Sequence, residues 1–235
     1  MPISTVFRTE LPEIMDDFEM EGTELQEALD KIASINQFLG GNSITIDGIK
    51  KLLAGKDKLQ TYTIIDIGCG NGDMLRKLAD FGFQNDFKLQ LIGIDANQFT
   101  INYAKQLSDV YPNILFKCVN IFDKQFDELK YDIALLTLTL HHFTEKEILC
   151  LLEKIHTNSK LGLVINDLQR SKLAYRLFQV LAFVCQLNKM SKDDGLVSIL
   201  RGFKKSDFIK YANKLKFNNY KVQWKWAFRY QWIIK

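Results

Sequence analysis

A glycine-rich turn directly after a strand-like run is the feature that most constrains this chain. In TYTIIDIGCGNGDM, residues 61–74, the run leads into Gly68, Gly70 and Gly72, and a helical pattern then begins. Because glycine lacks a Cβ, such a turn at the carboxyl end of a buried strand brings bare backbone against a ligand. The sequence therefore predicts a nucleotide-type pocket at this strand end.

The segments after this turn predict a doubly wound α/β sheet. Strand-like runs lie at 62–67, 88–95, 114–119, 131–137 and 161–167, and helical patterns fill most of the gaps. Such alternation predicts parallel strands joined by right-handed crossovers, with helices on both faces. Two aromatic runs, 220–228 and 230–235, are close enough in sequence to pair as an antiparallel hairpin.

Helical patterns flank this block on both sides. Residues 12–53 have apolar side chains at three- and four-residue spacing, and Gly40 and Gly41 are expected to end the first helix. Residues 170–187 predict a helix that is apolar over much of its circumference, which suits a core, a dimer surface, a membrane surface or an apolar acceptor. A last helix is expected near 204–216.

Composition narrows the class of protein. The 235 residues fit one domain with an appendage, and neither a signal-peptide start nor an apolar run of membrane-spanning length is present, so we expect a cytoplasmic protein. The four cysteines lie far apart, which predicts reduced thiols and no metal site. Residues 1–30 carry nine acidic side chains, and residues 201–235 carry ten basic ones. The basic end indicates a surface for an acidic partner such as RNA or anionic lipid. Alternatively, the two chain ends meet, or both are simply solvated.

The residues around the glycines discriminate between cofactor classes. No Lys-Ser or Lys-Thr follows Gly72, which argues against a P-loop. The third glycine position of a dinucleotide site is occupied by Asp73, whose charge would repel a pyrophosphate at a helix start. Asp95 ends the next strand, where a carboxylate can accept hydrogen bonds from ribose hydroxyls. A nucleoside without phosphates, and with a positive charge, fits these residues.

The combination of Asp66, Gly68, Gly70, Gly72 and Asp95 resembles the class I S-adenosylmethionine-dependent methyltransferases over about residues 60–167. The resemblance implies a Rossmann-like seven-stranded sheet whose last strand is antiparallel, with S-adenosyl-L-methionine as cofactor and S-adenosyl-L-homocysteine as product. It also implies the cofactor-binding residues, which are Asp66, Gly68, Cys69 and Gly70 around the methionine portion, Asp95 at the ribose, Ala96 and Asn97 beside the adenine, Asn120 and Ile121 after the third strand, and Thr137 at the end of the fourth. The family usually has an acidic residue where this chain has Asn120.

Candidate catalytic residues follow from the same resemblance, because YDIALLTLTLHHF resembles the family's fourth strand, which commonly closes with two histidines. The candidates are His142, Asp167, Arg170, Tyr175 and Arg201. Purely structural roles remain open for most of these residues. His142 and the neighbouring His141 could belong to the framework, and Asp167 could cap a helix. Arg170 and Arg201 could form salt bridges to Asp193 or Asp194.

The flanking segments resemble a subgroup of bacterial small-molecule methyltransferases linked to polyketide, phenolic-lipid and quinone-like products. This implies an N-terminal helical cap at 1–55, a cofactor-binding domain at 56–235 and a lid insertion at about 168–202. The expected reaction is O-methylation of a small, apolar or aromatic acceptor, which needs in-line positioning and help in deprotonating a hydroxyl.

Two alternatives remain open. The first is an RNA methyltransferase that stacks bases on Trp224, Trp226 and Trp232, although nucleic acid is not the expected partner. The second is a non-catalytic subunit with the same fold. Contact with a membrane surface, and the choice between monomer and homodimer, are also undecided by the sequence.

Overall fold

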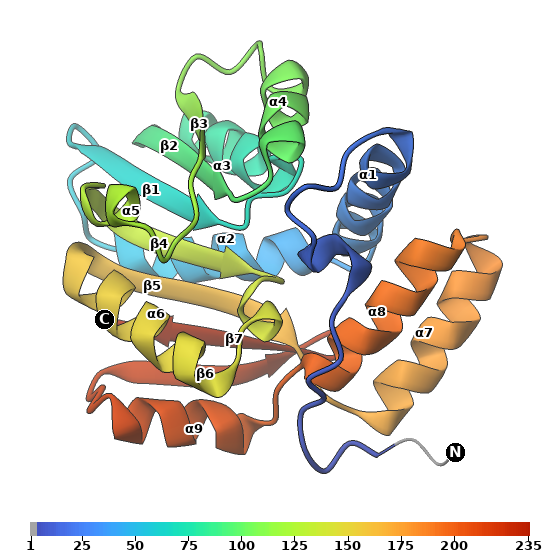
Figure 1. The fold of residues 1–235 in the computed structure, drawn as a ribbon. Helices are drawn as coiled ribbons and strands as arrows, with labels where there is room; N and C mark the ends of the chain where they lie inside the picture. Colours follow the sequence, from blue (N-terminus) through green and yellow to red (C-terminus); the bar gives the residue numbers. More distant parts are fainter. Residues whose placement is uncertain (1–3) are drawn as a thin grey trace.

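The computed structural model describes residues 4–235 and contains a seven-stranded mixed sheet in the order β3, β2, β1, β4, β5, β7, β6 (Figure 1). The strands are β1 Thr61–Ile67, β2 Lys88–Asp95, β3 Ile114–Cys118, β4 Tyr131–Thr137, β5 Ser159–Leu168, β6 Tyr220–Lys225 and β7 Arg229–Ile234. The first five are parallel, and β7 runs antiparallel to both β5 and β6. The predicted sheet and its C-terminal hairpin are confirmed.

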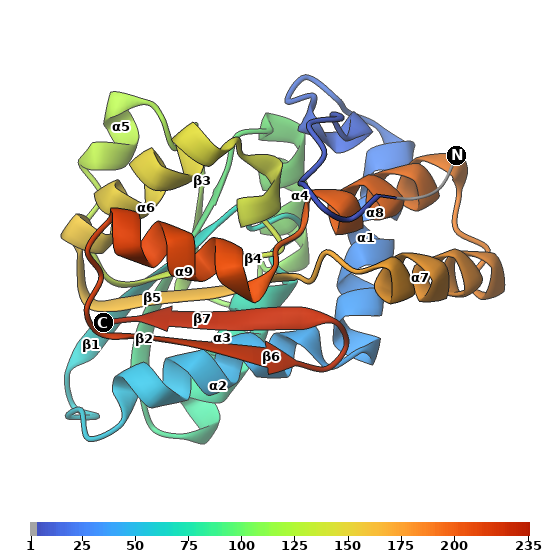
Figure 2. The same cartoon turned by 90° about the horizontal axis from the view of Figure 1, so that it is seen from below.

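Helices cover both faces of the sheet (Figure 2). One face packs against α5 (Lys124–Asp127), α6 (Glu145–Asn158) and α9 (Lys205–Lys214), and the other against α2 (Gly41–Leu53), α3 (Asp73–Gln84) and α4 (Gln98–Leu107). Side chains alternate along each strand, so Ile65 and Ile67 of β1 belong to the first core and Ile64 to the second. The central strands are therefore apolar on both sides, as a buried parallel sheet requires.

The remaining helices lie beyond the carboxyl ends of the parallel strands (Figure 1). They are the short 3-10 helices η1 (Ile14–Asp16) and η2 (Leu140–His142), together with α1 (Thr23–Phe38), α7 (Lys172–Val184) and α8 (Lys189–Arg201). Helix α8 packs against α1, α7, η1 and η2. This group of helices encloses the space above the glycine turn.

The N-terminal region differs from the helical stretch expected at 12–53. Helix α1 begins only at Thr23, after Gly22 adopts a positive φ of 96°, and residues 17–22 are not helical. Gly40, at a φ of 74°, separates α1 from α2, so the expected break is present. In α2, a Cβ on Gly48 would lie 2.4 Å from Cγ1 of Val164 in β5, and glycine therefore lets this helix pack closely on the sheet. How the chain divides into cap, domain and lid stays a prediction.

Helix α7 is less buried than its apolar sequence suggested, because Ala174 and Ala182 are its only buried residues. Among the helices of the described chain, none has both the length and the apolar character needed to cross a bilayer.

Trp232 tests the aromatic core beneath β7. Its side chain is fully buried and its ring centroid lies 5.1 Å from that of Phe208, whereas the side chain of Trp226 is exposed. We expect Trp232→Ala to lower the free energy of unfolding by about 3 to 5 kcal/mol, because it leaves a cavity. Trp226→Ala is the matched control and should change it by less than about 0.5 kcal/mol. Urea denaturation measures both, and equal effects would contradict the packing described here.

Candidate active site

The glycine turn after β1 is held by the neighbouring strand. Gly68, Gly70 and Gly72 all have positive φ, at 69°, 52° and 78°. The N–H groups of Gly68 and Cys69 both donate to the carbonyl oxygen of Ile94 in β2, at 2.8 and 3.0 Å. A Cβ on Gly68 would lie 2.5 Å from Cγ2 of Thr139, so the turn has no room for a side chain there. These contacts fix the backbone of the turn at the edge of a cavity.

The cavity has a volume of about 860 Å³, within the range of about 300 to 1,000 Å³ that is usual for small-molecule sites. All ten residues predicted to bind the cofactor line it: Asp66, Gly68, Cys69, Gly70, Asp95, Ala96, Asn97, Asn120, Ile121 and Thr137. The structure therefore brings this whole set together, whereas the contact that each would make stays a prediction.

Asp66 has the most unusual environment of these ten. Its carboxylate is buried at the cavity wall, and within residues 4–235 its Oδ1 atom has no hydrogen-bond partner. Burial raises its pKa well above the usual value, and the nearby carboxylates of Asp73 and Asp95 raise it further. A buried acceptor without a partner is costly unless a ligand supplies the donor. A cationic donor would also relieve the repulsion among the three carboxylates.

Asp95 at the end of β2 links the turn to the next loop. Its Oδ2 accepts a hydrogen bond from the N–H of Gly70 at 3.2 Å, and its Oδ1 accepts one from the N–H of Asn97 at 3.1 Å. Burial raises the pKa of this carboxyl, and these backbone donors oppose the rise. Each carboxylate oxygen has two lone pairs, so capacity for further donors remains on the cavity side.

Asn97 and Asn120 already make local hydrogen bonds. Asn97 caps α4, since its Oδ1 accepts from the N–H of Thr100 at 2.8 Å, and its Nδ2 donates to the carbonyl oxygen of Met20 at 2.7 Å. Asn120 Oδ1 accepts from the N–H of Phe122 at 3.0 Å. The side chain of Asn97 is therefore a framework element that ties the N-terminal segment to the cavity rim.

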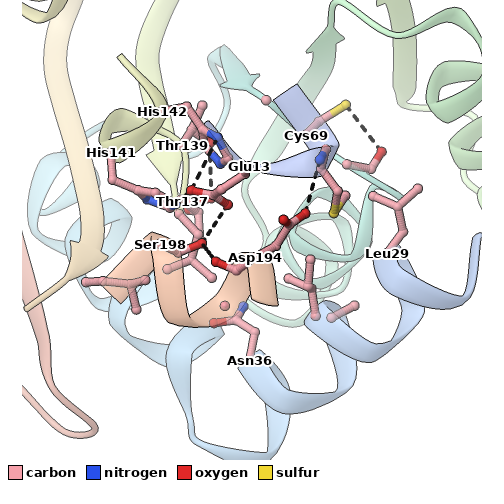
Figure 3. A pocket seen from close by; sticks show the side chains of 18 of the residues that line it. Glu13, Leu29, Asn36, Cys69, Thr137, Thr139, His141, His142, Asp194 and Ser198 are labelled. Atoms are coloured by element: carbon pink, nitrogen blue, oxygen red, sulfur yellow. Dashed lines mark hydrogen bonds and ion pairs between the residues drawn. The ribbon is translucent and has the colours of Figure 1, made fainter. Parts of the chain in front are cut away.

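A group of carboxylates and imidazoles forms another part of the cavity wall, after the end of β4 (Figure 3). His141 Nδ1 lies 2.8 Å from Oδ1 of Asp167, and His142 Nδ1 lies 2.6 Å from Oδ1 of Asp16. Glu13 is buried beside both rings and accepts a hydrogen bond from Ser198 Oγ at 2.6 Å. His142, a predicted catalytic residue, is therefore at the cavity, together with acidic residues that the sequence had not indicated.

Asp167 and Tyr175 lie elsewhere than expected. Within the described part of the chain, neither belongs to the cavity wall. Asp167 is fully buried and holds His141, and although burial alone would raise its pKa, the imidazole and the N–H of Leu168 lower it. Tyr175 is half-buried on α7. Any role of Asp167 in the chemistry would have to act through His141.

Arg170 and Arg201 are also absent from the cavity wall among residues 4–235, and their partners differ from those expected. Arg170 Nη1 lies 3.1 Å from Oδ2 of Asp207, and Arg201 Nη1 lies 2.6 Å from Oδ2 of Asp16. Asp194, the expected partner, instead accepts hydrogen bonds from two backbone N–H groups of η1 at 2.7 and 3.1 Å. The expected salt bridges to Asp193 or Asp194 are wrong, because unpaired N–H groups at a helix start attract a carboxylate.

The sequence analysis did not indicate Glu13 or Asp16 as residues of the site, whereas it did expect N-terminal helices over the cofactor. In their segment, PEIMDD, Glu13 and Asp16 are three residues apart, a spacing that also suits an ordinary helix and so indicates no particular site. Nothing local in the sequence shows that this segment packs against η2 and α8, since its partners there lie 126 and 185 residues away.

Comparisons with known proteins agree with this geometry. A family model described as a methyltransferase domain matches residues 58–230. The protein 235L of Invertebrate iridescent virus 6, named as a methyltransferase candidate, is 35% identical over 94 residues, which are 39% of this chain. That match spans about a third, 32%, of the viral protein.

Solved structures resemble this chain over most of its length. A plantazolicin methyltransferase, BamL, solved with a triazolic desmethylPZN analog and S-adenosylhomocysteine, has a TM-score of 0.68 at 18% identity and covers 89% of this chain and 90% of its own. Magnesium protoporphyrin IX methyltransferase from Synechocystis PCC 6803, solved with S-adenosylhomocysteine, has a TM-score of 0.54 at 17% identity, with 85% of each chain covered. At these identities the likeness shows the fold.

Gly68 and Thr139 form a pair that tests the turn. We expect Gly68→Ala to lower the free energy of unfolding by about 2 to 4 kcal/mol, because the new Cβ collides with Thr139 and the positive φ disfavours a side chain. The double variant Gly68→Ala with Thr139→Ala removes the two closest atoms and should recover about half of this loss. Chemical denaturation of the two single variants and the double variant measures the coupling, and strictly additive effects would refute the close contact.

Proposed function

The chain belongs to the methyltransferase-domain family, and from this premise we propose that it transfers a methyl group from S-adenosylmethionine to a small acceptor molecule. The observation that carries the proposal is the single cavity that joins the glycine turn, the unpartnered carboxylate oxygen of Asp66 and the carboxylate of Asp95. These groups offer what a phosphate-free, cationic adenosine derivative needs.

The residues present fit such a cofactor. Asp66 would accept hydrogen bonds from the cofactor's ammonium group, and Asp95 would accept them from the ribose hydroxyls. Asp73, at the first position of α3, adds negative charge where a phosphate-binding site would need none. When bound, S-adenosylmethionine supplies a methyl group on a positively charged sulfur. The three carboxylates then favour this cation over an anionic nucleotide.

The acceptor would occupy the part of the cavity between α1, α7 and α8. Apolar side chains of α1 and α7 dominate this part, among them Leu25, Leu29, Leu177, Phe178 and Leu181. An apolar or aromatic acceptor would bury its surface there, while Glu13, His141 and His142 would orient one polar group. A phenol has a pKa of about 10, so its hydroxyl needs help to lose a proton. The imidazole and carboxylate groups at this wall would assist that deprotonation, which favours O-methylation.

The similar folds support a small acceptor molecule, since they include plantazolicin and magnesium protoporphyrin IX methyltransferases. RNA is the weaker alternative, because Trp232 is buried in the core, although Trp224 and Trp226 are exposed. RNA binding that weakens steeply with salt would favour that alternative.

Asp95 tests the cofactor site. We expect Asp95→Ala to weaken binding of S-adenosylhomocysteine by about 1.5 to 3 kcal/mol, because two charge-assisted hydrogen bonds to the ribose are lost. Asp109→Ala removes an exposed carboxylate of the same type and should leave the affinity unchanged. Isothermal titration calorimetry measures both. Equal affinity of Asp95→Ala and the native chain would place the ribose elsewhere, and a native chain that binds no S-adenosylhomocysteine would favour a non-catalytic subunit.

Helix α7 offers a surface for an anionic membrane from which an apolar acceptor could enter. Leu173, Leu177, Val180 and Val184 form an exposed stripe at spacings of four, three and four residues. The exposed cations Lys172 and Arg176 stand on the same helix, and this combination of apolar stripe and basic residues is typical of membrane-surface helices. Leu177 also lines the cavity, so the stripe continues into the part of the cavity proposed for the acceptor.

Val180 tests this surface. We expect the native chain to sediment with phosphatidylglycerol vesicles more than with phosphatidylcholine vesicles, and Val180→Glu to reduce the bound fraction severalfold. Phe83→Glu alters an exposed apolar residue at the end of α3, far from α7 in sequence, and should bind as the native chain does. Binding by Val180→Glu equal to the native chain would refute the membrane surface, and a dimer that Val180→Glu dissociates would assign the stripe to a subunit interface.

A further inference from the structure

We propose that Glu13, His141 and His142 form a binding site for one divalent transition-metal ion, such as Zn²⁺, on the acceptor side of the cavity. Within the described residues, these three side chains form a group whose ligand atoms all lie within 4.8 Å of one another. The inference deepens the proposed function and relies on it for the ion's catalytic use, whereas the binding itself does not depend on it.

The distances suit one ion. Glu13 Oε1 lies 3.6 Å from His141 Nε2 and 3.9 Å from His142 Nδ1. Zinc binds imidazole nitrogen and carboxylate oxygen at about 2.0 to 2.2 Å, which separates two ligands of a tetrahedral ion by roughly 3.4 Å. Both distances from Glu13 Oε1 are close to that separation.

A second carboxylate orients the first imidazole. Asp167 Oδ1 lies 2.8 Å from His141 Nδ1, and Asp167 is itself held by the N–H groups of His141 and Leu168 at 3.2 and 2.7 Å. With Nδ1 donating to Asp167, Nε2 carries the lone pair and points to Glu13. Metal-binding histidines in proteins are commonly held by a carboxylate in this way.

Glu13 supplies an independent observation. Glu13 is 94% buried, and its Oε2 accepts a hydrogen bond from Ser198. Within residues 4–235, its Oε1 has no hydrogen-bond partner. A buried carboxylate oxygen without a donor is costly, and a cation between the two imidazoles would satisfy it. Arg201 Nη1 forms an ion pair with Oε1 at 3.7 Å, which is beyond hydrogen-bond distance, and its shorter contact is with Asp16 Oδ2 at 2.6 Å.

The local charge also favours a divalent cation. The carboxylates of the cluster are Glu13, Asp16, Asp167 and Asp194. Against these four stand three guanidinium groups. Arg201 pairs with Asp16, Arg8 donates to the backbone carbonyls of His141 and Phe143, and the buried Arg229 interacts with Asp167. With both imidazoles neutral, as metal binding requires, one negative charge remains.

The ligand types select the ion. Two imidazoles and one carboxylate suit Zn²⁺ and related transition metals, whereas Mg²⁺ prefers oxygen ligands and retains water. In the structure His142 Nδ1 is hydrogen-bonded to Asp16 Oδ1 at 2.6 Å, so binding of the ion at Nδ1 would displace the shared proton and break this hydrogen bond. An acceptor hydroxyl that took an open position would have its pKa lowered by the ion and would release its proton to water. The resulting oxyanion would take the methyl group from the sulfonium of S-adenosylmethionine, leaving S-adenosylhomocysteine.

Metal titration of the full chain tests the inference. After treatment with EDTA and dialysis, we expect isothermal titration calorimetry to show one Zn²⁺ per chain and no comparable binding of Mg²⁺. Glu13→Gln keeps the side-chain shape and the bond to Ser198, and His142→Ala removes the more exposed imidazole, so each should weaken Zn²⁺ binding at least tenfold. His156→Ala, on α6, is the matched control and should bind Zn²⁺ as the native chain does.

Co²⁺ substitution provides a spectroscopic signature, because ligation by the imidazoles should give visible absorption bands that Glu13→Gln alters. No Zn²⁺ uptake by the native chain, or equal uptake by Glu13→Gln, His142→Ala and the native chain, would overturn the proposal. Thermal shifts with S-adenosylhomocysteine, measured on the same samples, verify folding and test the cofactor site separately, so metal binding and the proposed function can fail independently.

Discussion

The hydrogen bonds from Gly68 and Cys69 to the carbonyl oxygen of Ile94 are the constraint on which the rest of the site depends. Gly68 has a positive φ of 69°, and these hydrogen bonds hold the turn after β1 against the end of β2. This brings Asp66, the backbone of the turn and Asp95 to one cavity wall, although two of these groups come from different strands. A parallel sheet makes such convergence possible because its strands end at the same edge.

The opposite wall depends on buried polar contacts. Glu13 and Asp16 come from a segment near the start of the chain, and they pack between η2 and α8. Buried charges are tolerated only when they are paired or hydrogen-bonded, so Arg201, Ser198 and the imidazoles hold this segment in place. The N-terminal segment therefore contributes carboxylates to the cavity wall as well as covering the cavity.

Long-range partners explain where the sequence-based expectations fell short. The strand boundaries agreed closely, since a buried parallel strand is recognisable from its own apolar run. The partners of Arg170 and Arg201 were wrong, because a guanidinium group has no local preference among the acids of a folded chain. The exposure of the apolar stripe on α7 could not be predicted either, since an apolar helix can have the same sequence whether it faces a core, a membrane or a second subunit.

The sequence by itself determined the class of fold and the part of the cavity wall around the glycine turn, because the turn, Asp66 and Asp95 are placed by local backbone geometry and strand order. Only the tertiary structure decided the part of the wall that holds Glu13 and the two histidines. More than a hundred residues separate Glu13 from His141, and 26 residues separate His141 from Asp167. These side chains meet only because of how their segments pack. Local propensity acts over a few residues, whereas burial of charge is settled by the whole fold.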